Sequence, residues 1–119
     1  MQQTDYTAVH FLRGRQTTNA NGFTPFISIY PGWYSSRVPH IHIEILSSSG
    51  SSLLVTQVVF PENISSQVYS SLNYTSHGQA NTSNTSDNVF SDSLSSELAT
   101  VTGNLTDGYT LTKTIVVSV

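Results

Sequence analysis

The run His40-Ile41-His42-Ile43-Glu44-Ile45 alternates between polar and apolar residues at every position. Alternation with a period of two is typical of a β-strand that buries one face, and it is incompatible with an amphipathic helix. The three isoleucines then share one face, and the two histidines and the glutamate share the other. We expect the isoleucine face to pack on the core and the polar face to remain open for chemistry.

Three further segments are predicted to be strands. Residues 23–30 follow the turn signal Asn19-Ala20-Asn21-Gly22 and end at Pro31-Gly32. Residues 53–60 are dense enough in apolar side chains for a strand that is buried on both faces. Residues 109–119 alternate and close the chain as a last strand, and the polar run 47–52 is predicted to be a turn. The expected fold class is therefore all-β.

The region from 61 to 108 has a different character. Residues 63–69 are predicted to be helical, and residues 91–98 carry a capping signal that favours a short helix. Between them, residues 75–87 form a long polar loop, and loops of that length are often functional. The length of 119 residues fits one domain, which we expect to span residues 1–119.

Composition excludes several classes of function. Charged residues are only 9% of the chain, and four Lys and Arg residues cannot form a phosphate-binding surface, so nucleic acid is not an expected partner. The absence of cysteine excludes disulfides and thiolate metal sites. No apolar segment is long enough for a membrane span, so no membrane partner is expected. The 20 Ser and 15 Thr residues favour a secreted or periplasmic protein, whose signal peptide is not in this sequence.

The densest chemistry lies between Tyr30 and His42. A His-X-His pair on a strand places both imidazoles on one face, about 7 Å apart, and one metal ion can bridge that gap. Tyr34 and Arg37 precede the pair, and Pro39 fixes the approach. Phenolate oxygen together with imidazole suits ferric iron. The alternative interpretation is two histidines on an ordinary polar strand face.

These residues resemble a known family. The string Pro31-Gly32-Trp33-Tyr34, Arg37 and His40-Ile41-His42, together with Phe11-Leu12-Arg13-Gly14 and the run 54–60, is similar to the intradiol ring-cleavage dioxygenases. The similarity is greatest to the secreted protocatechuate-dioxygenase-like branch, which includes relatives of catechol dioxygenases. It extends over essentially the whole chain from Phe11 onward.

The resemblance implies a β-sandwich that holds non-haem Fe(III) and cleaves catechol-type diols with O₂ to muconate-type diacids. Tyr34, His40 and His42 match metal ligands of the family, and Tyr34 matches the tyrosine that leaves the metal when a catecholate binds. Arg37 matches the arginine that stabilises charge on the substrate ring. Gln57 matches a glutamine of the same pocket. Tyr34, Arg37 and Gln57 are thus the expected catalytic residues.

One family feature has no counterpart. The first tyrosine ligand, with its upstream strands, would fall before Met1, so we expect an N-terminally shortened sandwich. Tyr6 is a candidate substitute, although its spacing does not match. A Tyr/His/His site completed by water is chemically reasonable and could take zinc instead of iron. An incomplete sandwich exposes a sheet edge, which favours a homodimer.

Two other functions remain open at this stage. One is a truncated or degenerate metal-binding β-sandwich without ring-cleavage activity, and the other is a carbohydrate- or surface-associated sandwich without a metal. Single residues have ordinary alternatives as well. Tyr34 could be a plain strand-end aromatic, Arg37 could form a surface ion pair with Glu44, and Gln57 could satisfy backbone groups in the sheet.

Outlying residues carry weaker signals. His10 is expected on a strand surface, and His77 could line the mouth of the pocket. Arg13 and Arg15 alternate on an expected strand and so face one side. Asp87 and Asp92 are candidate calcium ligands, although their spacing fits no known pattern. Five Asn-X-Ser/Thr sequons begin at Asn63, Asn73, Asn81, Asn84 and Asn104.

Overall fold

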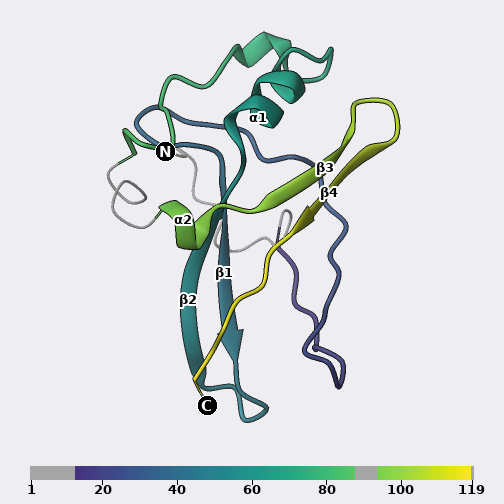
Figure 1. The fold of residues 1–119 in the computed structure, drawn as a ribbon, viewed down its shortest axis with the longest axis vertical. Helices are drawn as coiled ribbons and strands as arrows, with labels where there is room; N and C mark the ends of the chain where they lie inside the picture. Colours follow the sequence, from purple (N-terminus) through teal and green to yellow (C-terminus); the bar gives the residue numbers. More distant parts are fainter. Residues whose placement is uncertain (1–12, 88–93, 119) are drawn as a thin grey trace. The chain divides into compact units, whose positions relative to one another are not determined.

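The computed structural model describes residues 13–87 and 94–118 (Figure 1). The chain divides into two compact units, Met1–Tyr30 and Pro31–Val119. All helices and strands of the described residues belong to the second unit. That unit also contains the His-X-His motif.

The central element is an antiparallel hairpin of β1 (His40–Leu46) and β2 (Ser52–Val59). His40 pairs with Val59 and His42 pairs with Gln57, and the register shifts once near the loop, between Ile45 and Leu46. The connecting serines close the loop through backbone hydrogen bonds, and Gly50 takes the positive φ of 91° that the turn requires. The structure therefore confirms both predicted strands and the turn between them.

Burial along β2 changes from one end of the strand to the other rather than from face to face. Val58 and Val59, at the end of β2, are 1% and 0% exposed, whereas Val55 is 65% exposed. Of the isoleucine face, Ile41 is still 38% exposed. The prediction that residues 40–45 have one buried and one open face is thus too simple. The prediction that residues 53–60 are buried on both faces is too simple as well. The core gathers where β1 begins and β2 ends.

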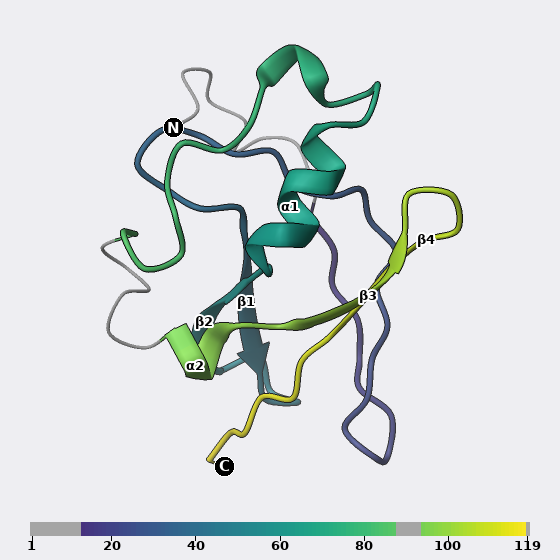
Figure 2. The same cartoon turned by 45° about the horizontal axis from the view of Figure 1, so that its top comes forward.

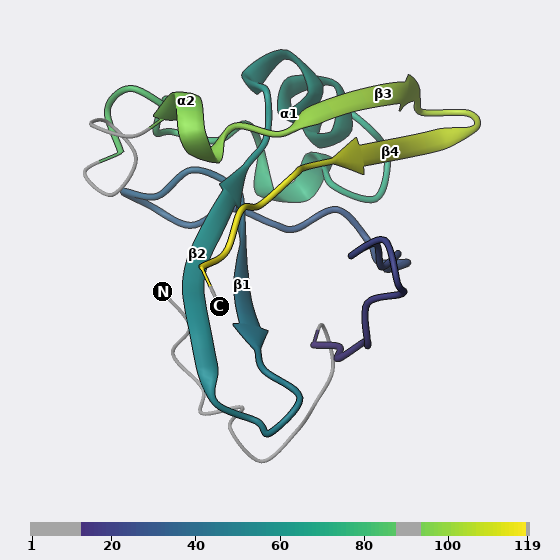
Figure 3. The ribbon, with the colours of Figure 1, turned by 60° about the horizontal axis from the view of Figure 1, so that its bottom comes forward.

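Helices and a second hairpin lie at that same end (Figure 3). Helix α1 (Glu62–Tyr69) follows β2 directly and buries Ile64, Val68 and Tyr69. After it come the 3₁₀ turn η1 (Thr75–His77) and helix α2 (Leu94–Glu97). The predictions of a helix at 63–69 and of a long loop after it are confirmed. The helix predicted over 91–98 is four residues long where the structure describes it.

The second hairpin joins β3 (Thr100–Asn104) and β4 (Gly108–Thr112), as Figure 2 shows. Strand β3 had not been predicted, and β4 ends at Thr112 rather than at the C-terminus. The two strands approach very closely at Gly103, where a Cβ would lie 2.2 Å from the carbonyl oxygen of Gly108. Only glycine fits that position, which explains a residue that weakens the strand pattern in the sequence.

The strand predicted for residues 23–30 is wrong, and so is the one expected around Arg13 and Arg15. Residues 13–18 and 22–30 have no regular secondary structure. Pro25 has no N–H to donate to a ladder, and β-propensity alone does not form a strand without a partner. Phe26 instead lies against Gly14 within the first unit.

In its coarse class the described part of the chain is strand-rich, with two antiparallel two-stranded sheets and short helices. Among the described residues, no helix has both the length and the apolar character needed to cross a membrane.

Candidate functional site

The two histidines of the motif lie next to each other on β1. Their ring centroids are 5.0 Å apart and the ring planes meet at 71°. Because alternate residues of a strand share a face, both rings project from the same side, which is also the side of Gln57 opposite His42. His40 is half-buried and His42 is exposed. The spacing and the common face predicted from the sequence are therefore present.

A backbone contact fixes the orientation of His40. Its Nδ1 lies 2.6 Å from the carbonyl oxygen of Val38, and since a carbonyl only accepts, Nδ1 carries the proton and donates it. In the neutral ring, Nε2 then carries the free lone pair. Metal-binding histidines commonly use the second ring nitrogen in this way. His40 is thus held in the tautomer that leaves Nε2 available as a ligand atom.

The environment also keeps His40 neutral. Partial burial lowers its pKa below the ordinary value of 6.5. The hydrogen bond to Val38 opposes this effect, the positive charge of Arg37 and the neighbouring His42 add to it, and Asp87 opposes it. A lowered pKa favours coordination, because only the neutral imidazole can bind a metal ion.

A tight turn brings Tyr34 and Arg37 together just before β1. The two residues form an isolated antiparallel bridge, and the amide of Arg37 donates to the carbonyl of Tyr34 at 3.2 Å. Ser36, inside the turn, has a φ of 74°, in the left-handed region that non-glycine residues rarely occupy. The Tyr34 ring meets His40 edge-on, with centroids 6.2 Å apart. This turn therefore places a phenol beside the histidine pair.

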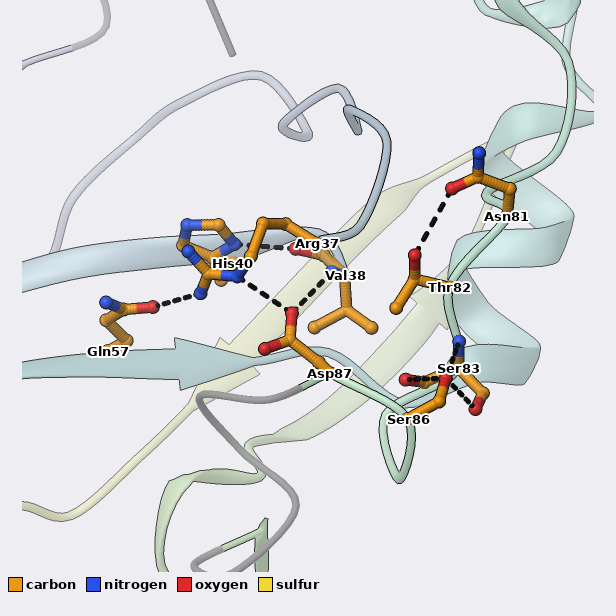
Figure 4. Close-up of polar contacts among 9 residues, drawn as sticks. All are labelled: Arg37, Val38, His40, Gln57, Asn81, Thr82, Ser83, Ser86 and Asp87. Carbon is orange, nitrogen blue, oxygen red and sulfur yellow. Dashed lines mark hydrogen bonds and ion pairs between the residues drawn. The ribbon is translucent and has the colours of Figure 1, made fainter.

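Arg37 is held by two side chains from distant parts of the chain (Figure 4). Its Nε donates to Oδ2 of Asp87 at 2.9 Å, and its terminal NH2 group donates to Oε1 of Gln57 at 2.8 Å. The same Asp87 oxygen accepts the backbone N–H of Val38 at 2.9 Å. Asp87 is fully buried, whereas 18% of the Arg37 side chain is exposed. The result is an immobilised guanidinium next to His40.

The loop that carries Asp87 is anchored in turn. The backbone amide of Asp87 donates to the carbonyl of Ser83. The hydroxyls of Ser83 and Ser86 lie 2.7 Å apart (Figure 4). The buried Asn84 donates from Nδ2 to the carbonyl of Phe60, at the end of β2. Asp87 therefore reaches Arg37 from a loop tied to the hairpin, although 50 residues separate the two.

These contacts correct two sequence-based interpretations. Asp87 is the ion-pair partner of Arg37 and not an exposed calcium ligand, and Asp92 lies outside the described residues. The alternative ion pair between Arg37 and Glu44 is replaced by the one to Asp87. Nothing in the local sequence around Asp87 indicated this role, since the partner is so remote. Tyr6 and His10 also lie outside the described residues.

His77 contacts the site segment from the long loop. Its Nε2 hydrogen-bonds the carbonyl of Trp33 at 2.9 Å, and its ring lies 4.4 Å from that of Trp33, centroid to centroid. The indole Nε1 of Trp33 donates to the carbonyl of Gly78 at 3.0 Å. His77 thus fixes the loop to the residue before Tyr34. Its expected place at a pocket mouth stays a prediction.

A separate cavity lies between α1 and the loop 79–84. It has a volume of about 260 Å³ and is lined by residues that include Glu62, Ser65 and Tyr69. The five predicted site residues do not line it. The histidine face therefore belongs to a different part of the surface from this cavity.

The donors at the histidine face fit a metal ion. Two imidazoles in contact, one with its tautomer fixed, and a phenol against the first ring are a suitable nitrogen and oxygen donor set for iron or zinc. Within residues 13–87 and 94–118, the histidine face included, no three His, Asp or Glu side chains gather as a metal site. The ligands that the resemblance assigns to this chain are one tyrosine and two histidines. They are therefore not a group of three His, Asp or Glu side chains.

Comparison with protein-family models gives no match for this chain, and neither curated proteins nor solved structures show a detectable similarity to it.

Proposed function

We propose that the chain is an Fe(III)-dependent intradiol dioxygenase-like enzyme that opens catechol-type diols. In this reaction the bond between the two hydroxyl-bearing carbons breaks, and both atoms of O₂ enter the resulting muconate-type diacid. The observation that carries the proposal is the grouping of His40, His42 and Tyr34 beside an immobilised Arg37. The finer fold that goes with it is an intradiol-type β-sandwich.

Tyr34, His40 and His42 would hold the metal, and water would complete its coordination. Bound Fe(III) would supply the Lewis acidity and the redox chemistry that couple the diol to O₂. Zinc would fit the same donors but would not support the reaction. The Val38 carbonyl keeps the ring of His40 in one orientation throughout.

The remaining side chains supply electrostatics. Arg37 would stabilise the negative charge that develops on the substrate ring, and a guanidinium already held by Asp87 and Gln57 needs little reorganisation. Oη of Tyr34 is the atom proposed to take up a proton from the incoming diol. Gln57 would line the pocket while its Oε1 holds Arg37.

The decisive experiment is to load the purified chain with iron and incubate it with catechol, hydroxyquinol and protocatechuate in air. The proposal expects a visible tyrosinate-to-iron absorption band and diacid products detected by mass spectrometry. Tyr34→Phe should abolish the band but leave the fold intact. A colourless, iron-loaded protein without diacid products contradicts the proposal.

A second candidate is a metal-binding module without ring cleavage. The observation that favours it is that the hydrogen bonds from Arg37 to Asp87 and Gln57 occupy donors that a substrate would otherwise use. The same assay separates the two functions. Tight metal binding without diacid formation from any of the three diols selects the module.

We also propose export to a secreted or periplasmic location and assembly as a homodimer. The composition rich in Ser and Thr supports the location. The two-stranded sheets support the dimer, because a two-stranded sheet leaves strand edges that a second copy can cover. Light scattering coupled to size exclusion tests the dimer directly, and a monomer at micromolar concentration contradicts it.

A further inference from the structure

The sequons of this chain are more frequent than its composition requires. Five of its eight asparagines begin an Asn-X-Ser/Thr sequon, although Ser and Thr together are 35 of 119 residues. A sequon can carry a glycan in a folded protein only where the asparagine side chain reaches solvent and is not needed for packing. The structure allows the five to be compared on that basis.

Asn84 fails this requirement. It is 7% exposed, and its Nδ2, the atom that would carry the sugar, donates to the carbonyl of Phe60. Its backbone amide also donates to the carboxylate of Glu62. A glycan on Nδ2 would have to displace the end of β2 from the loop that holds Asp87.

Three other sequons have either a hydrogen-bonded asparagine side chain or a buried hydroxyl residue. Asn81 is exposed, but its Nδ2 donates to the hydroxyl of Ser35 at 3.3 Å. Asn104 closes the turn between β3 and β4, where its Oδ1 accepts two backbone amides and its Nδ2 donates to Asp107. Asn63 is exposed, but the hydroxyl residue of its sequon, Ser65, is only 6% exposed.

Asn73 differs from the other four. It lies in the turn after α1, and both Asn73 and the hydroxyl residue Thr75 are exposed. Its neighbour Leu72 is 91% exposed, whereas Tyr74, on its other side, is partly buried and its ring lies 5.9 Å from that of Tyr69. Exposed turns of this kind tolerate large attachments.

We propose that Asn73 is the N-glycosylation site of this chain and that Asn84 stays unmodified. Nδ2 of Asn73 forms a bond to C1 of the reducing-end sugar of a lipid-pyrophosphate-linked oligosaccharide. The C1–oxygen bond to pyrophosphate breaks, the lipid pyrophosphate leaves, and the amide nitrogen loses one proton. The inference rests on the proposed export but not on ring cleavage.

The experiment expresses the full chain behind a secretion signal in a eukaryotic host and maps glycopeptides by mass spectrometry. Secreted and microsomal protein are both analysed, so poor export does not remove the readout. We expect a glycan on Asn73, removable by an amidase that converts the asparagine to aspartate, and an unmodified Asn84. An empty Asn73, or a glycan on Asn84 in the secreted protein, overturns the proposal.

Two matched variants test the sequon itself. Thr75→Ala removes the hydroxyl that the transferase requires but keeps Asn73, so the glycan should be lost. Thr75→Ser keeps the hydroxyl, so the glycan should remain. Glycan retention in Thr75→Ala also overturns the assignment.

Discussion

The buried carboxylate of Asp87 lies 2.9 Å from Nε of Arg37 and binds the backbone amide of Val38 with the same oxygen. The Asp87 side chain therefore binds both the guanidinium of Arg37 and the backbone of Val38, two residues before β1 begins. Because Asp87 is 0% exposed, its charge is compensated by protein contacts, of which these two are part.

Replacement of Asp87 by alanine should destabilise the protein by about 3 kcal/mol, the cost of breaking a buried ion pair. The guanidinium and the Val38 amide both lose their bond to this carboxylate, while the guanidinium keeps its bond to Gln57. Urea unfolding followed by circular dichroism measures the change. Asp87→Asn is the matched control, because it preserves the shape and removes the charge. A loss below about 0.5 kcal/mol for the alanine variant would show that the pair is not a structural element.

A glycine in the strained turn before β1 should stabilise the protein, in contrast to the Asp87 substitution. Ser36 has a φ of 74°, which costs about 1 kcal/mol for a residue with a side chain. Ser36→Gly should therefore raise the free energy of unfolding, and Ser36→Val should lower it. Ser35→Gly, one residue earlier, is the control and should not stabilise. A destabilised Ser36→Gly variant would contradict the role assigned to this backbone conformation.

Metal retention should depend on His42 and not on its neighbour along the same face. His42→Ala leaves two of the three proposed ligands, so we expect affinity for iron and zinc to fall by at least about tenfold. Glu44→Ala is the matched control, because Glu44 is also exposed and projects from the same face of β1. Calorimetric titration of each variant gives the affinities. Equal losses in both variants would mean that the metal is not held at the histidine pair.

The free energy of unfolding of the metal-free protein should decrease as the pH is lowered below the ordinary histidine pKa of 6.5. The pKa of His40 is lowered in the folded state, so between the two values the unfolded chain binds a proton that the folded chain does not. Stability contributed by neutral His40 is therefore complete above about pH 6.5 and is lost as pH falls toward the folded pKa.

Urea unfolding at pH 7.5 and pH 5.5 tests this dependence. The difference between the two pH values should be smaller for His40→Asn than for the wild-type protein, because the other titrating groups are common to both. An unchanged difference would show that His40 does not titrate differently in the two states.

The sequence predicts those parts of the fold that depend on local pattern. The alternation from His40 to Ile45 and the apolar run after it predict a hairpin, because both strands and the turn lie within about 20 residues. Residues 23–30 have comparable β-propensity but do not form the predicted strand, because Pro25 and the lack of a partner strand outweigh that propensity. Propensity predicts a strand only when a second strand is available.

The candidate site shows the same limit. The common face of His40 and His42 follows from a period of two, and Arg37 is near them in sequence. The partnership of Arg37 with Asp87 requires the fold of a polar loop 50 residues away, and no local pattern encodes it. The sequence therefore offered Asp87 only as a candidate calcium ligand, and it gave no sign that Asn84 anchors the same loop.

From the separation of Asp87 and the hairpin in the sequence we expect an order of events during folding. His40, His42 and Gln57 are joined through one short loop, and a hairpin of this kind forms in about 1–10 μs. Closure of the chain between Arg37 and Asp87 has a larger entropy cost and comes later. For that interval the nascent protein has paired histidines but an unrestrained arginine. If the histidine pair binds a metal ion as we propose, the ion would meet these two ligands before the charged half of the site exists, and it would then act as a template on which the rest of the chain folds.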